Sequence, residues 1–544
     1  MSKINKIAIL VMLIFVVTPI AFVASENTSK EYVGKFSIDM LKTLKSGDNT
    51  FEIIVMLKED ASKYVDVLKT FGKVKRTFSI IPAAVMRVDK DSIYRLATLD
   101  FVDKIWPNAK VRALLDTSVA DIGATYVWET YGYDGSGITI AIIDTGIDAS
   151  HVALDDLDDD PNTWDPKVIA FKDFINGLDD LDPSDGMDAY DDNGHGTHVA
   201  GIAAGTGAPD YLYIGVAPKA NLVGIKVLDE SGSGTLESVI AGIEWAVENK
   251  DTYNIRVINL SLGASLIQND GTSPVAIAVD KAVLSGIVAA VAAGNEGPRP
   301  NSISSPGDAH LAITVGAAFD SGEGNKGAVA SFSSQGPTDD GRIKPDITAP
   351  GVYIMAPEAN TGTGYIEHSG TSMATPHIAG VVALLLQADP NLDPAQVKYI
   401  LTRTTQVDYY SGNPDNTEGY GYVDVATAIE MISTLSDDLS SLEISINVFT
   451  EDVYRGRRYF GTNIYVTVKI TDLNGNPLAG IWVLVWFEDS SGSILEGVAG
   501  QTDSDGIFTA SYTTSTSGTY YIYALGDDYY NGYHYVYGYT TVTL

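Results

Sequence analysis

Three segments of this chain place a reactive side chain among glycines: AIIDTGID (141–148), DDNGHGTHVAG (191–201) and SGTSMATPHIAG (369–380). The reactive residues are Asp144, His195 and Ser372. A serine hydroxyl is a poor nucleophile alone, so a histidine must take its proton, and a carboxylate must orient that histidine and stabilise its charge. The three residue types therefore predict hydrolysis by acyl transfer, with Ser372 as nucleophile, His195 as general base and Asp144 as the orienting carboxylate.

Each of these residues has a simpler interpretation when it is taken alone. An aspartate after an apolar strand usually serves a turn or a cap. His195 and His198 lie three residues apart on one face of a predicted helix, which is the spacing of half a metal site. Because the three segments occur together, in the chain order Asp, His, Ser, the hydrolytic interpretation is favoured over separate coincidences.

A fourth segment supplies a polar amide at the end of an apolar run. Residues 287–297 read IVAAVAAGNEG, which predicts a buried strand followed by Asn295 between glycines. Acyl transfer needs hydrogen-bond donors aimed at the developing oxyanion. Asn295 can supply one through its side chain, and the backbone N–H of Ser372 can supply another, although Asn295 alone would be read as a turn residue.

The elements around these residues alternate between strands and helices, which predicts a parallel sheet with helices on both faces. The expected strands are ITIAIID, NLVGIKVLD, RVINLSL and IVAAVAA. The expected helices are 195–204, 235–249, 273–285 and 372–388. Active residues of such sheets gather at the carboxyl ends of strands, where Asp144 and Asn295 are predicted to lie. Ser372 is predicted to open a helix, whose positive end favours nearby negative charge.

Residues 119–430 resemble the subtilisin-like serine proteases, or subtilases. The segments that carry this resemblance include YGYDGSGITIAIIDTGID, IGVAPKANLVGIKVLD, INLSLG, SFSSQGPT, KPDITAPG and GYGYVDVATAI. The resemblance implies that Asp144, His195 and Ser372 form the catalytic triad and that Asn295 completes the oxyanion hole. His198, the second histidine of HGTH, is implied to be structural.

The resemblance also implies where a substrate binds. Protease substrates commonly bind as an added strand, and the two flanking edges are implied to be Gly232-Ser233-Gly234 and Ser261-Leu262-Gly263. Ala292, Ala293 and Gly294 are implied to line the primary specificity pocket. Since these segments hold no acidic residue, we expect broad or apolar specificity rather than processing at basic sites.

Carboxylates are concentrated between Asp144 and His195. Residues 155–192 contain 14 aspartates against Lys167 and Lys172. Calcium prefers such oxygen ligands, and we expect a structural calcium loop formed by Asp179, Asp180, Asp182, Asp185 and Asp188. A solvated acidic loop without metal is the alternative. The loop 206–213 resembles the calcium loop of the family, with Asp210 as a ligand, although Ala153 stands where the family has an aspartate.

Composition narrows the class of protein. The chain has 544 residues, a net charge of −35 and no cysteine, which excludes disulfides, thiolate metal sites and a thiol nucleophile. Residues 115–435 hold 13 Lys and Arg against 45 Asp and Glu, so nucleic-acid binding through phosphates is disfavoured. We expect a monomer that acts on protein or peptide substrates and is heat-adapted and calcium-loaded, with simple solubility as the alternative explanation of the charge.

The N-terminal part reads as an export signal followed by a small separate domain. Residues 1–25 have a basic start, an apolar stretch and a small-residue cleavage site, typical of a signal peptide rather than the alternative, a retained membrane anchor. Residues 26–114 predict a ferredoxin-like domain, with strands 51–58, 79–89 and 101–106 and helices 60–72 and 90–99. It resembles the subtilase propeptide, which implies a chaperone and inhibitor removed between Ala113 and Thr117.

The pattern of apolar and polar residues changes after about residue 440. Alternating apolar runs, separated by turn signals such as DLNGNP and TDSDG, predict an all-β sandwich of about seven strands. It loosely resembles bacterial immunoglobulin-like domains. Its tyrosines suit contact with a polysaccharide or a cell surface, or simply fill strands. We therefore expect a secreted enzyme in four parts: signal peptide (1–25), propeptide (26–114), catalytic domain (115–435) and β-sandwich (436–544).

Overall fold

A computed structural model gives the structure of this chain. It describes residues 35–37, 40, 44, 49–78, 81–108, 117–157, 165–182, 188–264, 268–323, 325–406, 414–432, 442–455, 458–490, 494–528 and 533–544. The chain divides into two compact units, Met1–Ala113 and Leu114–Leu544. The predicted signal peptide and the predicted maturation bond lie outside the described residues.

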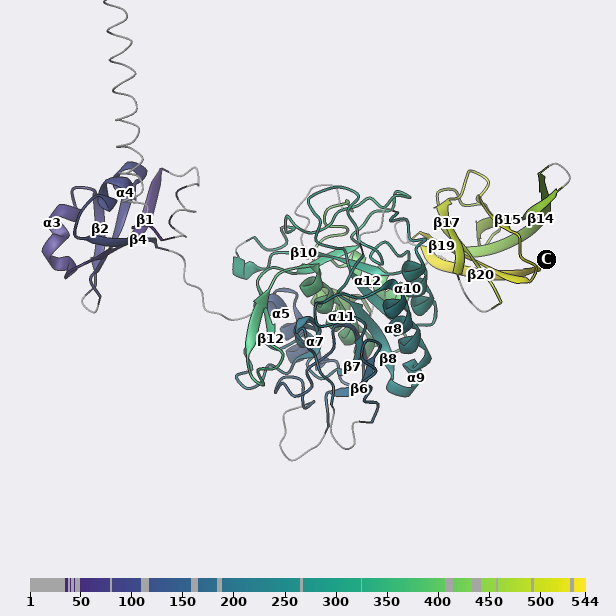
Figure 1. Cartoon of the computed structure of the whole chain (residues 1–544), viewed down its shortest axis with the longest axis horizontal. Coiled ribbons are helices and arrows are strands. Elements are labelled where there is room, and N and C mark those ends of the chain that lie inside the picture. The colour runs from purple at the N-terminus through teal and green to yellow at the C-terminus, as the bar shows by residue number, and fades with distance from the viewer. Residues whose placement is uncertain are drawn as a thin grey trace, which may run out of the picture. The chain divides into compact units, whose positions relative to one another are not determined.

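The first unit is built on a four-stranded antiparallel sheet in the order β2-β3-β1-β4 (Figure 1). Its elements are β1 (Thr50–Leu57), a 3-10 turn (Ala61–Tyr64), α3 (Val65–Leu68), β2 (Gly72–Thr77), β3 (Ala83–Asp89), α4 (Lys90–Ala97) and β4 (Val102–Pro107). The helix expected over 60–72 is shorter, because pairing with β3 draws the chain into β2 from Gly72 onward. A Cβ at Gly72 would lie 2.5 Å from the carbonyl oxygen of Arg87, so this close approach requires glycine.

The second unit contains the expected parallel sheet, with seven strands in the order β11-β10-β9-β8-β5-β7-β6. The strands are β5 (Thr139–Asp144), β6 (Val168–Asp173), β7 (Asn221–Lys226), β8 (Ile255–Leu260), β9 (Val288–Ala292), β10 (Ile313–Ala318) and β11 (Ile347–Pro350). Strands β5, β9 and β10 are buried at every residue, because helices cover both faces of the sheet. The prediction of an α/β fold with a parallel sheet flanked by helices is confirmed.

The helices of this unit are α5 (Ser118–Asp121), α6 (Ala124–Tyr131), α7 (His195–Ala204), α8 (Leu236–Glu248), α9 (Lys250–Tyr253), α10 (Pro274–Leu284), α11 (Thr371–Ala388), α12 (Pro394–Arg403) and α13 (Val425–Ile432). The four helices expected from the sequence, α7, α8, α10 and α11, begin within one residue of the predicted positions. Local capping sets two of these starts: the Thr235 side chain accepts from the N–H of Ser238, and Ser273 accepts from that of Ala276.

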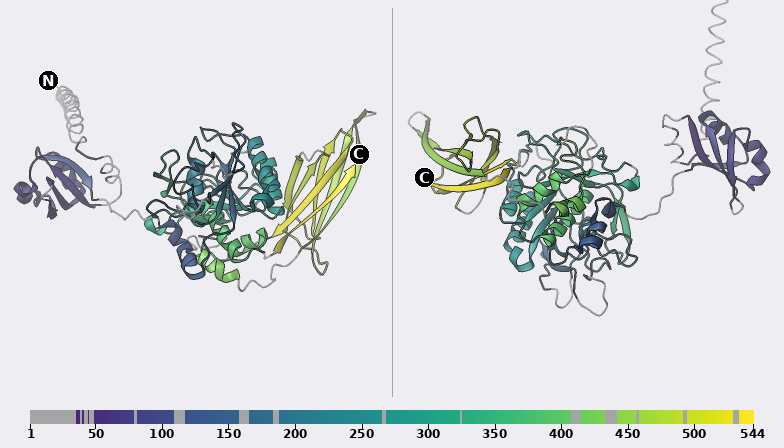
Figure 2. Two further views of the ribbon diagram at one scale, coloured as in Figure 1. Left: turned by 90° about the horizontal axis from the view of Figure 1, so that it is seen from below. Right: turned by 180° about the vertical axis from the view of Figure 1, so that it is seen from behind.

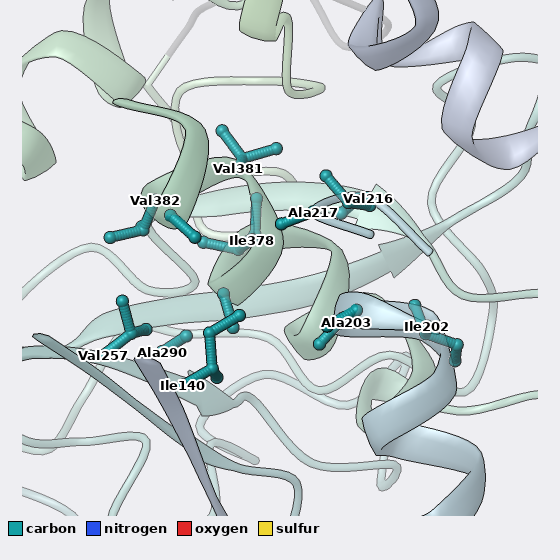
Figure 3. Close-up of a cluster of buried hydrophobic side chains, with 14 of the residues drawn as sticks. Ile140, Ile202, Ala203, Val216, Ala217, Val257, Ala290, Ile378, Val381 and Val382 are labelled. Atoms are coloured by element: carbon teal, nitrogen blue, oxygen red, sulfur yellow. The ribbon is translucent and has the colours of Figure 1, made fainter. Parts of the chain in front are cut away.

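Helix α11 forms the centre of one core. Its residues Ile378, Val381 and Val382 belong to the same buried cluster as the sheet residues Ile140 and Val257 (Figure 3). Helix α7 contributes residues to the same apolar cluster. Outside the large sheet, β12 (Ile354–Pro357) pairs with β13 (Tyr365–His368) as an antiparallel hairpin. Within the described residues, α11 is the one helix long and apolar enough to cross a membrane, but 83% of its apolar window is buried inside the protein. Its apolar character is therefore that of a core helix.

The C-terminal part consists of two antiparallel sheets (Figure 2). The first sheet has the order β14-β15-β18 and the second has the order β17-β16-β19-β20. The strands are β14 (Leu442–Arg455), β15 (Arg458–Asp472), β16 (Trp482–Glu488), β17 (Ile494–Gln501), β18 (Ile507–Thr514), β19 (Thr519–Asp528) and β20 (Tyr533–Thr543). Apolar residues from both sheets share one cluster. The described residues thus agree with an all-β domain.

Candidate active site

Asp144 and His195 meet where the end of β5 faces the start of α7. Asp144 is fully buried, and its Oδ1 lies 2.7 Å from Nδ1 of His195. The same oxygen accepts a hydrogen bond from the N–H of Thr145 at 2.7 Å, which orients the carboxylate. A Cβ on Gly196 would lie 2.1 Å from the carbonyl oxygen of Gly146, so this glycine allows α7 to begin against the end of β5. The contact leaves Nε2 as the nitrogen of His195 that is free for proton transfer.

The protonation of His195 is governed by two opposing effects. Burial disfavours the charged imidazolium, but the charge of Asp144 and its hydrogen bond outweigh burial, and the pKa of His195 is raised above its usual value. By contrast, burial and the neighbouring His368 lower the pKa of His198 to about 3. Nε2 of His198 lies 3.0 Å from the carbonyl oxygen of Ile366. The second histidine of HGTH is thus a buried, neutral packing residue in this geometry.

Asp191 organises the turn that precedes His195, and the sequence reasoning missed it. Its carboxylate accepts hydrogen bonds from the N–H of Gly194 and of Thr197, each at 2.8 Å, and from the hydroxyl groups of Thr145 and Thr197. The hydroxyl of Thr145 in turn accepts from the N–H of Gly196 at 2.9 Å. This network ties the first turn of α7 to the residue after Asp144. The sequence feature that could have revealed this role is the position of Asp191, an acidic residue just before the start of a predicted helix.

Ser372 is the second residue of α11 and lies beside β8. Its Oγ donates to the carbonyl oxygen of Ser261 at 3.1 Å, and the hydroxyl of Ser261 donates to the carbonyl oxygen of Ser372 at 2.8 Å. Ser372 and His195 together line two adjoining hollows on the surface. Residues 177 positions apart in the chain are thereby brought to one site.

Asn295 is oriented by the residue that precedes Ser372. The Oδ1 of Asn295 accepts from the N–H of Thr371 at 2.9 Å and from its hydroxyl at 3.1 Å. Because the oxygen is occupied, the amide Nδ2 is left as the donor. A Cβ placed on Gly370 would lie 3.6 Å both from this Nδ2 and from the backbone nitrogen of Ser372, so the two donors flank one small space that glycine keeps open.

The first hollow contains the two expected substrate edges. All six predicted residues line it, namely Gly232, Ser233, Gly234, Ser261, Leu262 and Gly263. The sequence reasoning missed several further lining residues, among them Val275 at the start of α10, Ser305 and Pro306. Their apolar or small side chains carried no signal of their own. The residues Ala292, Ala293 and Gly294 lie at the end of β9 and line neither described hollow; Ala292 and Ala293 are buried.

The second hollow joins Asn295 to the other side of Ser372. It is also lined by His368 and Glu358, which the sequence reasoning did not single out. Burial and the proximity of His195 lower the pKa of His368. Its position on the hairpin strand β13, far from His195 in the chain, concealed this residue from motif-based reasoning.

The acidic loop does not gather its carboxylates in the described residues. Asp179 accepts from the N–H of Asp173 and pairs with Lys172 at 2.5 Å, while Asp180 accepts from the N–H groups of Asp182 and Asp188. Across the described part of the chain, no three His, Asp or Glu side chains form a group that could hold a metal ion, Asp210 included. Asp185 lies outside the described residues. Calcium binding stays a prediction, whose test is the fall in melting temperature that a chelator would cause.

The fold and this set of side chains define a class of hydrolase. A model of the subtilase family matches residues 135–421, so the chain belongs to the subtilase family and is a serine endopeptidase. It is 38% identical over 380 residues to serine protease AprX of Bacillus subtilis strain 168, covering 66% of this chain and 81% of that protein. It is 34% identical over 426 residues to subtilisin E of the same organism, covering 77% and 98%.

Solved structures share the fold as well. The CspB protease of Clostridium perfringens is 20% identical to this chain and has a TM-score of 0.52, covering 59% of this chain and 100% of that structure. At that identity the likeness concerns the fold alone. It agrees with the parallel sheet and flanking helices described above.

Proposed function

We propose that this chain is a secreted endopeptidase made as a zymogen, in which Ser372 is the nucleophile, His195 the general base and acid, Asp144 the orienting carboxylate and Asn295 a donor to the oxyanion. The observation that carries the proposal is the 2.7 Å contact between Asp144 and His195 at a hollow that Ser372 also lines. That arrangement supplies the base and its orienting carboxylate in the geometry that serine activation requires.

In the proposed reaction the peptide lies between Gly232–Gly234 and Ser261–Gly263 as an added strand. The hydroxyl of Ser372 turns from the Ser261 carbonyl to Nε2 of His195, gives up its proton and attacks the scissile carbonyl carbon. The carbonyl oxygen becomes an oxyanion that accepts from Asn295 Nδ2 and from the N–H of Ser372. His195 then gives the proton to the leaving amine, and the C–N bond breaks.

Water completes the cycle. His195 takes a proton from a water molecule, which attacks the acyl carbon bound to Ser372. The second tetrahedral intermediate uses the same two donors, and its collapse returns the proton to the serine oxygen as the carboxylic acid product leaves. Asp144 stays ionised throughout and stabilises the imidazolium.

Replacing Asn295 by alanine is expected to lower kcat by about 10²–10³-fold, the loss known for the equivalent change in a subtilisin. KM is expected to change little, because the amide serves a charge that develops only in the transition state. Steady-state kinetics on a peptide substrate measure both constants. A loss confined to KM would mean that Asn295 binds the ground state instead, and the alanine variant of the exposed Ser331 serves as control.

The zymogen proposal assigns residues 1–25 to a signal peptide and 26–114 to a propeptide that folds separately and inhibits the enzyme. Its support is the division of the chain at Ala113 and the excess of positive charge in residues 26–114, opposite to that of 115–435. We further propose a preference for apolar side chains, since none of the described residues that line the first hollow is acidic.

Mass spectrometry of purified, self-processed enzyme tests processing and preference together. We expect a mature N-terminus between Ala113 and Thr117 and cleavage of added protein after apolar residues. Cleavage concentrated after lysine or arginine would favour the alternative of a selective processing protease. A mature chain that still carries residues 26–114 covalently would contradict the zymogen proposal.

A second candidate function is attachment to a polysaccharide or a cell surface through residues 436–544. Exposed aromatic side chains of this domain, such as Phe449 and Tyr539, favour it. Retention of the full chain, but not of a variant with both residues changed to serine, on insoluble polysaccharide would support this function. Equal retention of the two would dismiss it.

A further inference from the structure

Strand β16 buries both of its faces. Val483, Val485 and Phe487 point into the core between the two C-terminal sheets. The alternate residues Leu484 and Trp486 are equally buried, but they belong to a different cluster that includes helices of the catalytic domain. Because neighbouring side chains on a strand point to opposite faces, the catalytic domain covers the outer face of this sheet at β16.

The neighbouring strands extend this contact. Leu525 of β19 joins the same shared cluster, while Ile522 and Ala524 face the inner core. On β17, a Cβ at Gly497 would lie 3.0 Å from Cβ of Thr272 and 3.2 Å from Cδ1 of Ile277. The sheet therefore approaches the start of α10 as closely as its backbone allows.

A charge pair with a buried carboxylate crosses the same contact. Glu488 at the end of β16 is 3% exposed, and it accepts from Nε1 of Trp486 at 2.8 Å and pairs with the ammonium group of Lys281 on α10. That ammonium group also lies 5.6 Å from the ring centre of Tyr523. A carboxylate this well buried is tolerated only when it is paired, so Lys281 ties α10 to the C-terminal sheet.

Helix α10 connects this contact to the substrate hollow. Val275 in its first turn lines the hollow, and the capping residue Ser273 shares a 2.7 Å hydrogen bond with Ser305, which lines the hollow as well. We propose that the C-terminal β domain is a permanent brace of α10: it is retained in the active enzyme, stabilises the catalytic domain and holds one wall of the substrate hollow in place.

Calorimetry of the full chain in an inactive Ser372→Ala background tests the brace. Lys281→Glu places two carboxylates together, and Gly497→Val wedges a side chain against Thr272 without touching the inner core. Each is expected to lower the melting temperature of the catalytic domain by about 5 °C or more. The reciprocal pair Lys281→Glu with Glu488→Lys is expected to recover much of the loss, whereas Lys469→Glu, on the exposed side of β15, is expected to leave it unchanged.

The active enzyme gives an independent measure. If the brace holds the wall that contains Val275, Lys281→Glu and Gly497→Val are expected to raise KM for a long peptide severalfold while kcat changes less. If the C-terminal domain is only tethered to the catalytic domain and does not brace α10, both variants would melt at the temperature of the Lys469→Glu control, and their KM would be unchanged. That outcome would overturn the proposal.

Discussion

Replacing Ser372 by alanine is expected to lower kcat by a factor on the order of 10⁶, the loss known for the equivalent change in a subtilisin. Without the hydroxyl no acyl-enzyme forms, and water must attack the peptide directly. Some acceleration over the uncatalysed reaction is expected to remain, because Asn295 and the substrate edges are intact. The measurement is the rate of casein or peptide hydrolysis by purified protein of confirmed fold.

The same variant reports on maturation. If the chain processes itself, Ser372→Ala is expected to accumulate as an uncleaved precursor that still contains residues 26–114. The alanine variant of Ser331, an exposed serine on the loop after β10, is expected to process and digest normally. Hydrolysis by Ser372→Ala at the rate of the unaltered enzyme would refute the assignment of the nucleophile.

Replacing Asp144 by asparagine is expected to lower kcat near neutral pH by about 10⁴-fold. The amide has almost the shape of the carboxylate, but it cannot stabilise the imidazolium, and it holds His195 in the wrong tautomer. Asp251→Asn, a matched change on the exposed surface of α9, is expected to have no effect. Equal activities of the two variants would show that Asp144 has no role in the reaction.

The pH dependence of Asp144→Asn separates this role from a merely structural one. His195 must be neutral to accept a proton, so kcat/KM of the unaltered enzyme is expected to rise with pH through a pKa that Asp144 has raised above the usual value. In the asparagine variant burial is no longer opposed by a full charge, so the pKa of His195 falls and the acidic limb moves to lower pH. If the acidic limb lies at the same pH in both enzymes, the charge of Asp144 is not the cause of the raised pKa of His195.

Local sequence predicted the elements well where local forces set them. Capping by Thr235 and Ser273 marks the starts of α8 and α10, and continuous apolar runs mark strands buried on both faces. The helix expected over 60–72 came out shorter, because its end pairs as β2 with a strand more than ten residues further on. Pairing between distant residues is not encoded in a helical periodicity, so sequence alone could not predict it.

In the candidate site, too, sequence predicted some residues and only the folded structure showed others. Reactive residue types among glycines pointed to Asp144, His195, Ser372 and Asn295, since acyl transfer admits few combinations of side chains. Asp191 and Val275, by contrast, emerged only from the geometry. Their roles consist in holding or lining, which many residue types can do.

The sequence by itself determined the family, the candidate reactive groups and the alternation of strands and helices, because these depend on residue type and short spacing. Only the tertiary structure decided which partners the polar groups take: the Ser261 carbonyl for Ser372, Thr371 for Asn295, and Lys281 for Glu488. It also decided that IWVLVWFE belongs to two cores at once. An unbroken apolar run indicates that both faces of a strand are buried, but what covers the second face is set by surfaces that meet only after the chain has folded.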